Sequence, residues 1–260
     1  IHMLRLVTLT STLALMATSL MAEQIKVGVS PGEHAEIMEE VARVAEPMGL
    51  EIDVIEFSDY VVPNQALADG DIEANSFQHV PYLEAQMKDR GFALAVVGNT
   101  ITTPMGVYSD KITDIANLEE GATFGIPNDP TNGGRALLVL QQLGMIKVDP
   151  EAGLVPTVLD IIENPKDLSF KELDAAQLPR SLADLDAALI NTNYAIASGL
   201  SPKEDSIAME SADNPYVNVI AVQKGNEDAP WVKTLLEAYH SDEIKAFIDE
   251  SYHGTVITSW

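Results

Sequence analysis

Residues 25–56 read IKVGVSPGEHAEIMEEVARVAEPMGLEIDVIE, and their pattern sets the architecture of the chain. Residues 25–29 alternate between polar and apolar side chains, which is typical of a strand. Gly32 leads into a segment whose apolar side chains recur at helical spacing, and Gly49 ends that segment. Residues 51–56 then predict a second strand. A strand, a helix and a strand in this order indicate a right-handed crossover in a parallel sheet.

The same alternation of strands and helices continues along the chain. Short strands are predicted at residues 94–97, 106–108, 123–126, 187–190 and 217–222, and helices at residues 80–90 and 135–143. The chain has 260 residues, of which 46% are hydrophobic, and this is enough for one large domain or two of moderate size. We therefore expect an α/β protein.

An internal echo favours two similar halves. The segment LADGDIEAN at residues 67–75 resembles LADLDAALIN at residues 182–191, and both predict the end of a helix, a turn and a strand. We expect residues 23–108 to begin lobe 1, residues 109–213 to form lobe 2 and residues 214–260 to return to lobe 1.

The N-terminus, residues 1–22, is interpreted as a cloning remnant followed by an export signal. Two residues precede Met3, and an apolar stretch with interspersed small residues ends at Ala22. This stretch is shorter than the ~20 apolar residues of a membrane span and is interrupted by Thr and Ser. We therefore expect a secreted, periplasmic protein. The sequence contains no cysteine, so neither a disulfide nor a lipid anchor is expected.

The charge and the missing motifs exclude several functional classes. The chain has 15 basic and 40 acidic residues and a formal net charge of -25, which opposes binding to nucleic acid and to anionic membrane surfaces. Glycine-rich phosphate loops, a serine nucleophile elbow and the HExxH zinc motif are missing. No two of the five histidines stand at a spacing that places them on one helix face, so a metal site is not expected. We expect neither a cofactor nor enzymatic activity, and an exported hydrolase is the alternative of another class.

Three segments carry a resemblance to a known family. They read FQHVPYL at residues 77–83, PNDPTNGGR at residues 127–135 and PYVN at residues 215–218. In these segments the chain closely resembles the methionine-binding proteins of ABC importers, the NlpA lipoprotein group. Further matches follow in the same order at Asp59-Tyr60, Pro63-Asn64 and residues 163–166, 177–181 and 190–195. The family carries a lipid-bearing cysteine after its signal, whereas this chain has Ala22-Glu23 there.

The resemblance implies both a fold and a function. The fold is the two-lobed periplasmic-binding-protein fold of type II, with a hinge and a ligand cleft between the lobes. The function is that of a solute-binding protein that captures L-methionine and delivers it to the permease and the ATPase of an ABC importer. We expect a monomer that meets the membrane only through this transporter. Another small amino acid or a methionine-containing dipeptide is the alternative ligand.

The resemblance also assigns the polar end of the ligand to three residues. Arg135 follows Gly133-Gly134 at a predicted helix start, and its planar guanidinium is expected to bind the ligand carboxylate. Asn191 and Asn218 are expected to accept hydrogen bonds from the ammonium group. Asparagine near a turn is more often structural, so Asn193 and Asn214 receive no binding role.

The apolar end of the ligand is assigned to an aromatic slot. Its expected lining is Tyr60, Phe77, His79 and Tyr82, since a thioether packs favourably against aromatic edges. Of these, only His79 is a residue that usually sits in a core as a satisfied polar group, and its place in the slot depends on the resemblance alone.

Overall fold

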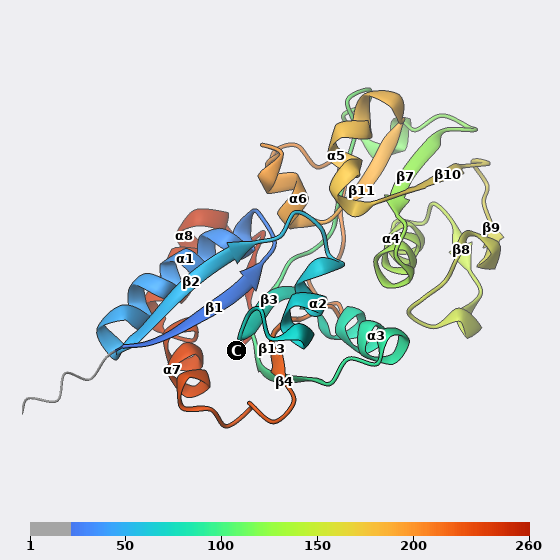
Figure 1. Cartoon of the computed structure of the whole chain (residues 1–260). Helices are drawn as coiled ribbons and strands as arrows, with labels where there is room; N and C mark the ends of the chain where they lie inside the picture. The colour runs from blue at the N-terminus through green and yellow to red at the C-terminus, as the bar shows by residue number, and fades with distance from the viewer. Residues whose placement is uncertain (1–21) are drawn as a thin grey trace, which may run out of the picture.

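The computed structural model describes residues 22–260. Two five-stranded sheets, each covered by helices, form two lobes that lie side by side (Figure 1). The predicted α/β class is confirmed. Residues 1–21, which hold nearly all of the predicted cloning remnant and export signal, lie outside the described residues. Between residues 22 and 260, none of the helices combines the length and the apolar character that a membrane span needs.

Lobe 1 is built on a sheet with the strand order β2-β1-β3-β13-β4. Its strands are β1 (Glu23–Val29), β2 (Leu50–Glu56), β3 (Ala74–His79), β4 (Leu94–Asn99) and β13 (Asn218–Gln223), and its helices are α1 (Glu33–Ala45), α2 (Val62–Asp69), α3 (Val80–Arg90), α7 (Pro230–Tyr239) and α8 (Asp242–Tyr252). β1 is parallel to β2 and β3, whereas β13 is antiparallel to β3 and β4. A ribbon of β5 (Ile101–Thr102) and β14 (Ile257–Thr258) completes the lobe.

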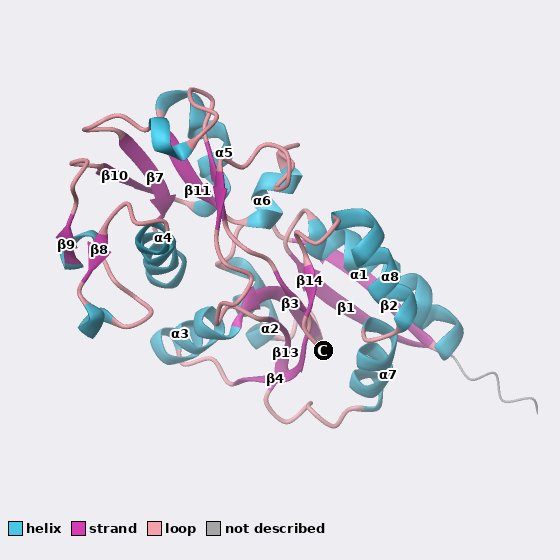
Figure 2. Cartoon of the chain, turned by 180° about the vertical axis from the view of Figure 1, so that it is seen from behind, coloured by secondary structure: helices cyan, strands magenta, loops and turns pink. Residues whose placement is uncertain are grey.

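The sheet of lobe 1 is buried on both faces, so its side chains supply two cores. In β13, Ile220 and Val222 belong to the core that α1, α7 and α8 cover. The alternate residues Val219 and Ala221 belong to the core under α2 and α3, as the two-residue period of a strand requires. Figure 2 shows α1, α7 and α8 grouped on one side of this sheet.

Lobe 2 repeats this construction around a sheet with the strand order β10-β7-β11-β6-β12. Its strands are β6 (Gly106–Tyr108), β7 (Thr123–Pro127), β10 (Ser169–Leu173), β11 (Ala187–Ile190) and β12 (Ala208–Met209), its helices are α4 (Pro130–Gln142), α5 (Leu178–Ser181) and α6 (Thr192–Ala197), and β8 (Lys147–Val148) and β9 (Ile161–Glu163) form a ribbon. β7 is parallel to β10 and β11, and β6 is antiparallel to β11. Short 3-10 segments cover Glu46–Met48 in lobe 1 and Ile115–Asn117, Pro150–Ala152, Val158–Asp160, Ala175–Gln177 and Leu182–Asp184 in lobe 2.

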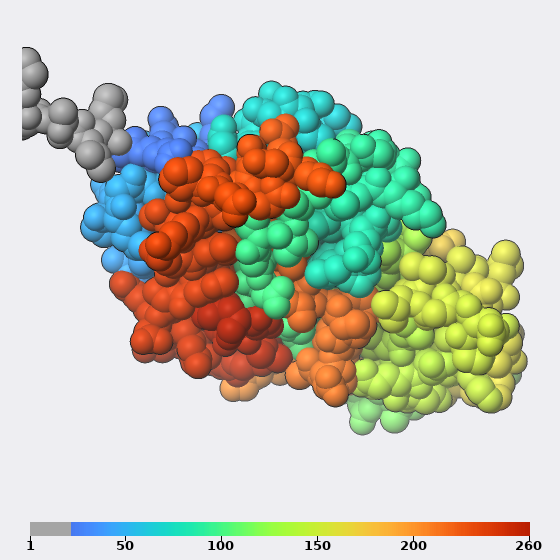
Figure 3. Space-filling model, turned by 90° about the horizontal axis from the view of Figure 1, so that it is seen from below, coloured from blue at the N-terminus to red at the C-terminus, as the bar shows by residue number. Residues whose placement is uncertain are grey.

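The chain crosses between the lobes twice. The first crossing joins β5 to β6 through residues 103–105, and the second joins β12 to β13 through residues 210–217. The sequence places the first boundary at residue 108, but β6 pairs with β11 in the sheet of lobe 2. A three-residue strand carries no pattern that tells which sheet it joins. We therefore propose to divide the chain at these two crossings. In Figure 3, lobe 2 forms one end of the molecule and abuts α3 of lobe 1.

The predicted local patterns hold in the two places where they carry the most weight. β1 and β2 pair in parallel along their whole length, as residues 25–56 predict. Gly49 ends the first helical segment in the left-handed conformation, with a φ of 88°. The two echoing segments, residues 67–75 and 182–191, each contain the end of a helical segment followed by a turn and a strand.

Candidate functional site

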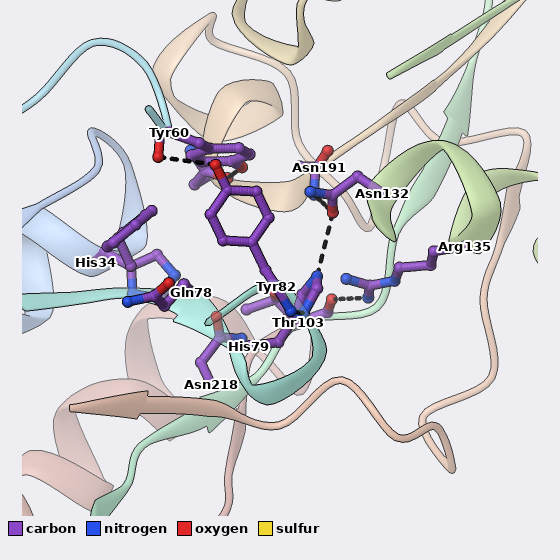
Figure 4. Close-up of a pocket in the computed structure, with 12 residues that line it drawn as sticks. His34, Tyr60, Gln78, His79, Tyr82, Thr103, Asn132, Arg135, Asn191 and Asn218 are labelled. Atoms are coloured by element: carbon purple, nitrogen blue, oxygen red, sulfur yellow. Dashed lines mark hydrogen bonds between the residues drawn. The ribbon is translucent and has the colours of Figure 1, made fainter. Parts of the chain in front are cut away.

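A pocket lies between the lobes (Figure 4). Its lining consists of His34, Tyr60, Phe77, Gln78, His79, Tyr82, Thr103, Asn132, Arg135, Asn191, Asn193 and Asn218. All seven residues that the sequence proposes for ligand binding are in this set. The structure thus brings the seven together in one cavity, although they are spread over 159 positions of sequence, from residue 60 to residue 218 counted inclusively.

The pocket forms where strand ends of the two sheets face each other. β3 ends at His79, and Asn191 directly follows β11. Asn218 opens the antiparallel strand β13 and pairs with His79, so it lies at the same edge of the sheet. Open α/β sheets commonly bind ligands beyond the carboxyl ends of their parallel strands, and both lobes present that edge to the pocket.

Three aromatic rings form the wall on the side of lobe 1. The ring centroid of Tyr60 lies 5.9 Å from that of Phe77 and 6.0 Å from that of Tyr82. The hydroxyl of Tyr82 donates to the backbone oxygen of Tyr60 at 2.9 Å, which fixes the loop that carries Tyr60. Phe77 and Tyr82 are buried. The wall is therefore apolar at its surface, with the Tyr82 hydroxyl already paired.

His79 sits at the junction between the aromatic wall and the polar side. Its Nδ1 accepts a hydrogen bond from the backbone N–H of Tyr82 at 3.1 Å, so the ring proton belongs on Nε2, which faces Oδ1 of Asn132 at 3.3 Å. Burial and the nearby positive charge of Arg135 lower the pKa of His79 to about 3. His79 is therefore a neutral wall residue and a hydrogen-bond donor.

Helix α4 places Arg135 in the pocket. Asp129 caps the helix by accepting a hydrogen bond from the backbone N–H of Asn132 at 2.9 Å, and Pro130 occupies the first helical position. A Cβ on Gly133 would lie 2.7 Å from the backbone oxygen of Pro127, and one on Gly134 would lie 2.8 Å from Cα of Val155. The two glycines therefore let α4 approach β7 and a neighbouring loop closely.

This helix begins five residues earlier than the sequence predicts, at Pro130 instead of Arg135. The sequence places the helix start after Gly133-Gly134, and glycine is a poor helix former, but the pair lies inside the helix where close packing requires it. Arg135 accordingly stands in the second turn of α4, not at its start.

Arg135 is buried, with only 2% of its surface exposed. Its Nη2 donates to the backbone oxygen of Thr103 at 2.8 Å and to the carboxylate of Glu210 at 2.5 Å, and its Nε donates to the same carboxylate at 3.0 Å. The ring of Tyr216 lies 4.3 Å from the guanidinium carbon, which is a cation–π geometry. These bonds occupy one edge of the guanidinium and leave Nη1 for the pocket.

Amide side chains form the wall on the side of lobe 2. Nδ2 of Asn191 donates to Oδ1 of Asn132 at 2.9 Å. Oδ1 of Asn191 is buried and has no hydrogen-bond partner among the described residues. A buried acceptor without a partner is costly, so this oxygen marks a place where a donor of a ligand fits.

Hydrogen bonds between the lobes close the pocket. Asn193 accepts from the hydroxyl of Tyr60 at 2.5 Å, and the hydroxyl of Tyr194 donates to the backbone oxygen of Ser58 at 3.2 Å. The pair of His79 and Asn132 is a third link. The rings of Tyr60 and Tyr194 also pack across the boundary, with their centroids 4.9 Å apart. The lobes therefore meet through hydrogen bonds and one aromatic contact, which a hinge can form and release.

The sequence missed five residues of the lining: His34, Gln78, Thr103, Asn132 and Asn193. Gln78 and Asn132 stand inside the segments that carry the family resemblance, and that position was the available signal. Asn193 lines the pocket although no role was predicted for it. Asn214 does not line it: its Oδ1 accepts from the backbone N–H of Tyr216 at 3.0 Å, as a turn residue does.

Two further titratable groups are buried near the pocket at the start of α1. Burial lowers the pKa of His34, a lining residue, to about 4. Burial raises the pKa of its neighbour Glu33 to about 8, and neither carboxyl oxygen of Glu33 has a hydrogen-bond partner among the described residues. Both groups are therefore uncharged at neutral pH. Within residues 22–260, no cluster of three His, Cys, Asp or Glu side chains has a metal-binding arrangement.

The chain is similar to several known proteins. It is 48% identical over 239 residues to the protein of Escherichia coli K12 named D-methionine-binding lipoprotein MetQ, covering 91% of this chain and 88% of that one. A solved structure of a nutrient-binding protein from Burkholderia cenocepacia bound to methionine is 52% identical, with a TM-score of 0.88 over 91% of this chain and all of that chain. Outer membrane lipoprotein 3 of Mannheimia haemolytica is 42% identical and covers 96% of this chain and 95% of that one. The family described as NlpA lipoprotein matches residues 25–260, and the chain belongs to that family.

Proposed function

We propose that this protein is an extracytoplasmic solute-binding protein that captures methionine between its two lobes and delivers it to an ABC importer. The observation that carries the proposal is the pocket itself. It combines one buried guanidinium, a buried amide oxygen and an aromatic wall, and these are the three groups that an apolar amino acid requires. Relatives of high identity are named for methionine binding.

The ligand carboxylate is assigned to Nη1 of Arg135. That nitrogen is the one left over by the bonds to Glu210 and Thr103, and a charge-assisted hydrogen bond to a carboxylate is among the strong ones. The ammonium group is assigned to Oδ1 of Asn191 and to the amide of Asn218, which lies on the opposite lobe. Neutral amides accept from an ammonium without adding another buried charge.

The thioether side chain is assigned to the slot of Tyr60, Phe77, His79 and Tyr82. Full burial of such a side chain contributes about 2 to 3 kcal/mol, and sulfur packs favourably at aromatic edges.

Closure of the lobes is the signal that the transporter reads in this proposal. The ligand contacts residues of both lobes, so it stabilises the closed arrangement that the Tyr60–Asn193 and Tyr194–Ser58 hydrogen bonds also hold. The partners are the permease and the ATPase of the importer, and the protein acts as a monomer in the periplasm. In this proposal the protein is not an enzyme, and methionine is released chemically unchanged.

Native mass spectrometry and calorimetry test this function. The purified protein is expected to carry one methionine or to bind one per chain, and titrations with L-methionine, D-methionine, leucine and a methionine-containing dipeptide rank the ligands. We propose L-methionine as the ligand, and the D form is included because relatives carry it in their names. Failure of both methionine enantiomers to bind would overturn the proposal. Consumption of a ligand during prolonged incubation would favour the exported hydrolase instead.

A further inference from the structure

Arg135 shares its burial with an acidic residue that stands outside the pocket lining. The carboxylate of Glu210 accepts from Nε of Arg135 at 3.0 and 3.1 Å and from Nη2 at 2.5 Å. It also accepts from the backbone N–H of Met105 at 2.9 Å. The side chains of Arg135 and Glu210 are 3% and 4% exposed. Glu210 is therefore a fully engaged carboxylate directly behind the guanidinium.

Arg135 and Glu210 carry the buried charges at the pocket, because the other buried titratable groups there are neutral. His79 and His34 are neutral because burial lowers their pKa values to about 3 and 4, and Glu33 is protonated because burial raises its pKa to about 8. Asp129 is partly exposed and caps the N-terminus of α4, whose partial positive charge offsets it. The buried charge at the polar end of the pocket is thus one plus and one minus.

We infer that Glu210 determines the charge class of the ligand: by cancelling the charge of Arg135, it makes the pocket accept a zwitterionic amino acid and reject a carboxylate that lacks the ammonium group. This inference rests on the proposed function, because it concerns the ligand of the same pocket. It adds a specificity-determining residue that does not touch the ligand and acts through Arg135.

The physical reason is the sum of charges in a closed, poorly hydrated space. With Arg135 and Glu210 both present, a zwitterion keeps that sum at zero, whereas a simple carboxylate makes it minus one. Like charges separated by a single guanidinium repel strongly at the low effective dielectric of a buried site. Without Glu210, the same carboxylate would neutralise Arg135, and the zwitterion would leave an excess positive charge.

The test compares methionine with 4-(methylthio)butanoate, which is methionine without its amino group. Both are titrated by calorimetry into the wild type and Glu210→Gln, and the readout is the ratio of the two dissociation constants within one protein. The substituted amide would keep an acceptor for Met105 and Arg135 but remove the charge, so we expect the preference for methionine to fall at least tenfold. Because both constants come from one preparation, a reduced folded fraction affects them equally.

Matched variants separate charge from structure. Glu210→Asp retains the carboxylate and is expected to keep most of the preference, and Glu210→Ser removes the charge a second way and serves if Glu210→Gln does not fold. Glu33→Gln replaces a buried carboxyl group that is already uncharged, so its ratio is expected to equal that of the wild type.

The outcomes distinguish the two proposals. If the wild type binds methionine and Glu210→Gln or Glu210→Ser keeps the wild-type ratio, the role of Glu210 is refuted and the proposed function stands. If the wild type binds neither compound, the proposed function itself fails. A ratio that falls equally in Glu210→Asp would assign the effect to shape and would also refute the inference.

Discussion

The two sides of the pocket handle buried polar groups in opposite ways. On the side of lobe 1, His34 and Glu33 are buried without a charged partner that pairs well, and burial shifts both pKa values toward the neutral form. On the side of lobe 2, Arg135 and Glu210 are buried as an ion pair with additional hydrogen bonds. A buried charge is retained only where partners compensate its lost hydration. The protein therefore concentrates its charge at one place, where the ligand carboxylate is proposed to bind.

The largest effect on methionine affinity is expected from removal of the buried cation of lobe 2. Arg135→Ala should weaken methionine binding by about 2 to 5 kcal/mol, because the ligand carboxylate would be buried without its cation. The measurement is calorimetry, with circular dichroism to verify folding. Arg90→Ala, on the exposed end of α3, is the matched control and should bind as the wild type does. A loss of less than tenfold would contradict the role of Arg135.

The next effect concerns the apolar wall of lobe 1. Phe77→Ala should weaken methionine binding by about 2 kcal/mol, because the thioether would lose a packing surface. Alanine, a ligand with a short side chain, should lose less affinity than methionine does, so the preference for methionine over alanine should narrow. Phe92→Ala is the control, since Phe92 packs in the core under α2 and α3 and does not line the pocket. An equal loss for both ligands would show that Phe77 supports the structure instead of the slot.

A smaller effect is expected on stability from the uncharged carboxyl group. The pKa of Glu33 in the folded protein, about 8, is above its ordinary value of 4.5, so between these pH values the folded state binds more protons than the unfolded state. Stability should therefore fall as pH rises through this window, by at most about 1.4 kcal/mol for each pH unit. The lowered pKa values of His34 and His79 act in the opposite direction, but only below about pH 6.5.

Urea unfolding at pH 6.5 and pH 8 isolates Glu33 from the histidines. Over this range the wild type should lose roughly 1 to 2 kcal/mol relative to Glu33→Gln, whose amide does not titrate. Glu39→Gln changes an exposed carboxylate on the same helix and should follow the wild type. Parallel curves for the wild type and Glu33→Gln would show that Glu33 is ionised in the folded protein.

The smallest expected effect is on the pH dependence of binding. His79 and His34 stay neutral above pH 5 because their pKa values are about 3 and 4. Methionine affinity should therefore change by less than about twofold between pH 5.5 and pH 7. Calorimetry in buffers of equal ionic strength measures this. A steep change in affinity near pH 6.5, the ordinary pKa of histidine, would show that an imidazole titrates in the pocket. The lobe 1 side would then also carry a charge, contrary to the contrast drawn above.

The sequence predicted individual strands and helices of this fold better than the contacts between them. The strands of residues 25–29 and 187–190 stand out because their hydrophobic pattern is local. The start of α4 was wrong, because the need for Gly133-Gly134 arises from Pro127 and Val155, which pack against the helix in space. The division that we propose at residues 103–105, in place of residue 108, has a similar reason, since strand pairing between β6 and β11 is not a local property.

The candidate site divides in the same way. The seven proposed residues lie in segments that resemble a known family, and all of them line the pocket, but their roles in binding stay predictions. Glu210 and His34 carried no comparable signal. Glu210 stands in an acidic chain with 40 carboxylates, and only its position beside Arg135 separates it from the others. Long-range charge pairing of this kind cannot be read from spacing.

Arg135 also has a mechanical consequence, because it touches both crossings between the lobes. Thr103 belongs to the first crossing, and Glu210 and Tyr216 belong to the second. A displacement of the Arg135 guanidinium would therefore shift its partners in both connecting segments. In the proposed binding mode, the ligand carboxylate is therefore linked through Arg135 to both segments that connect the lobes.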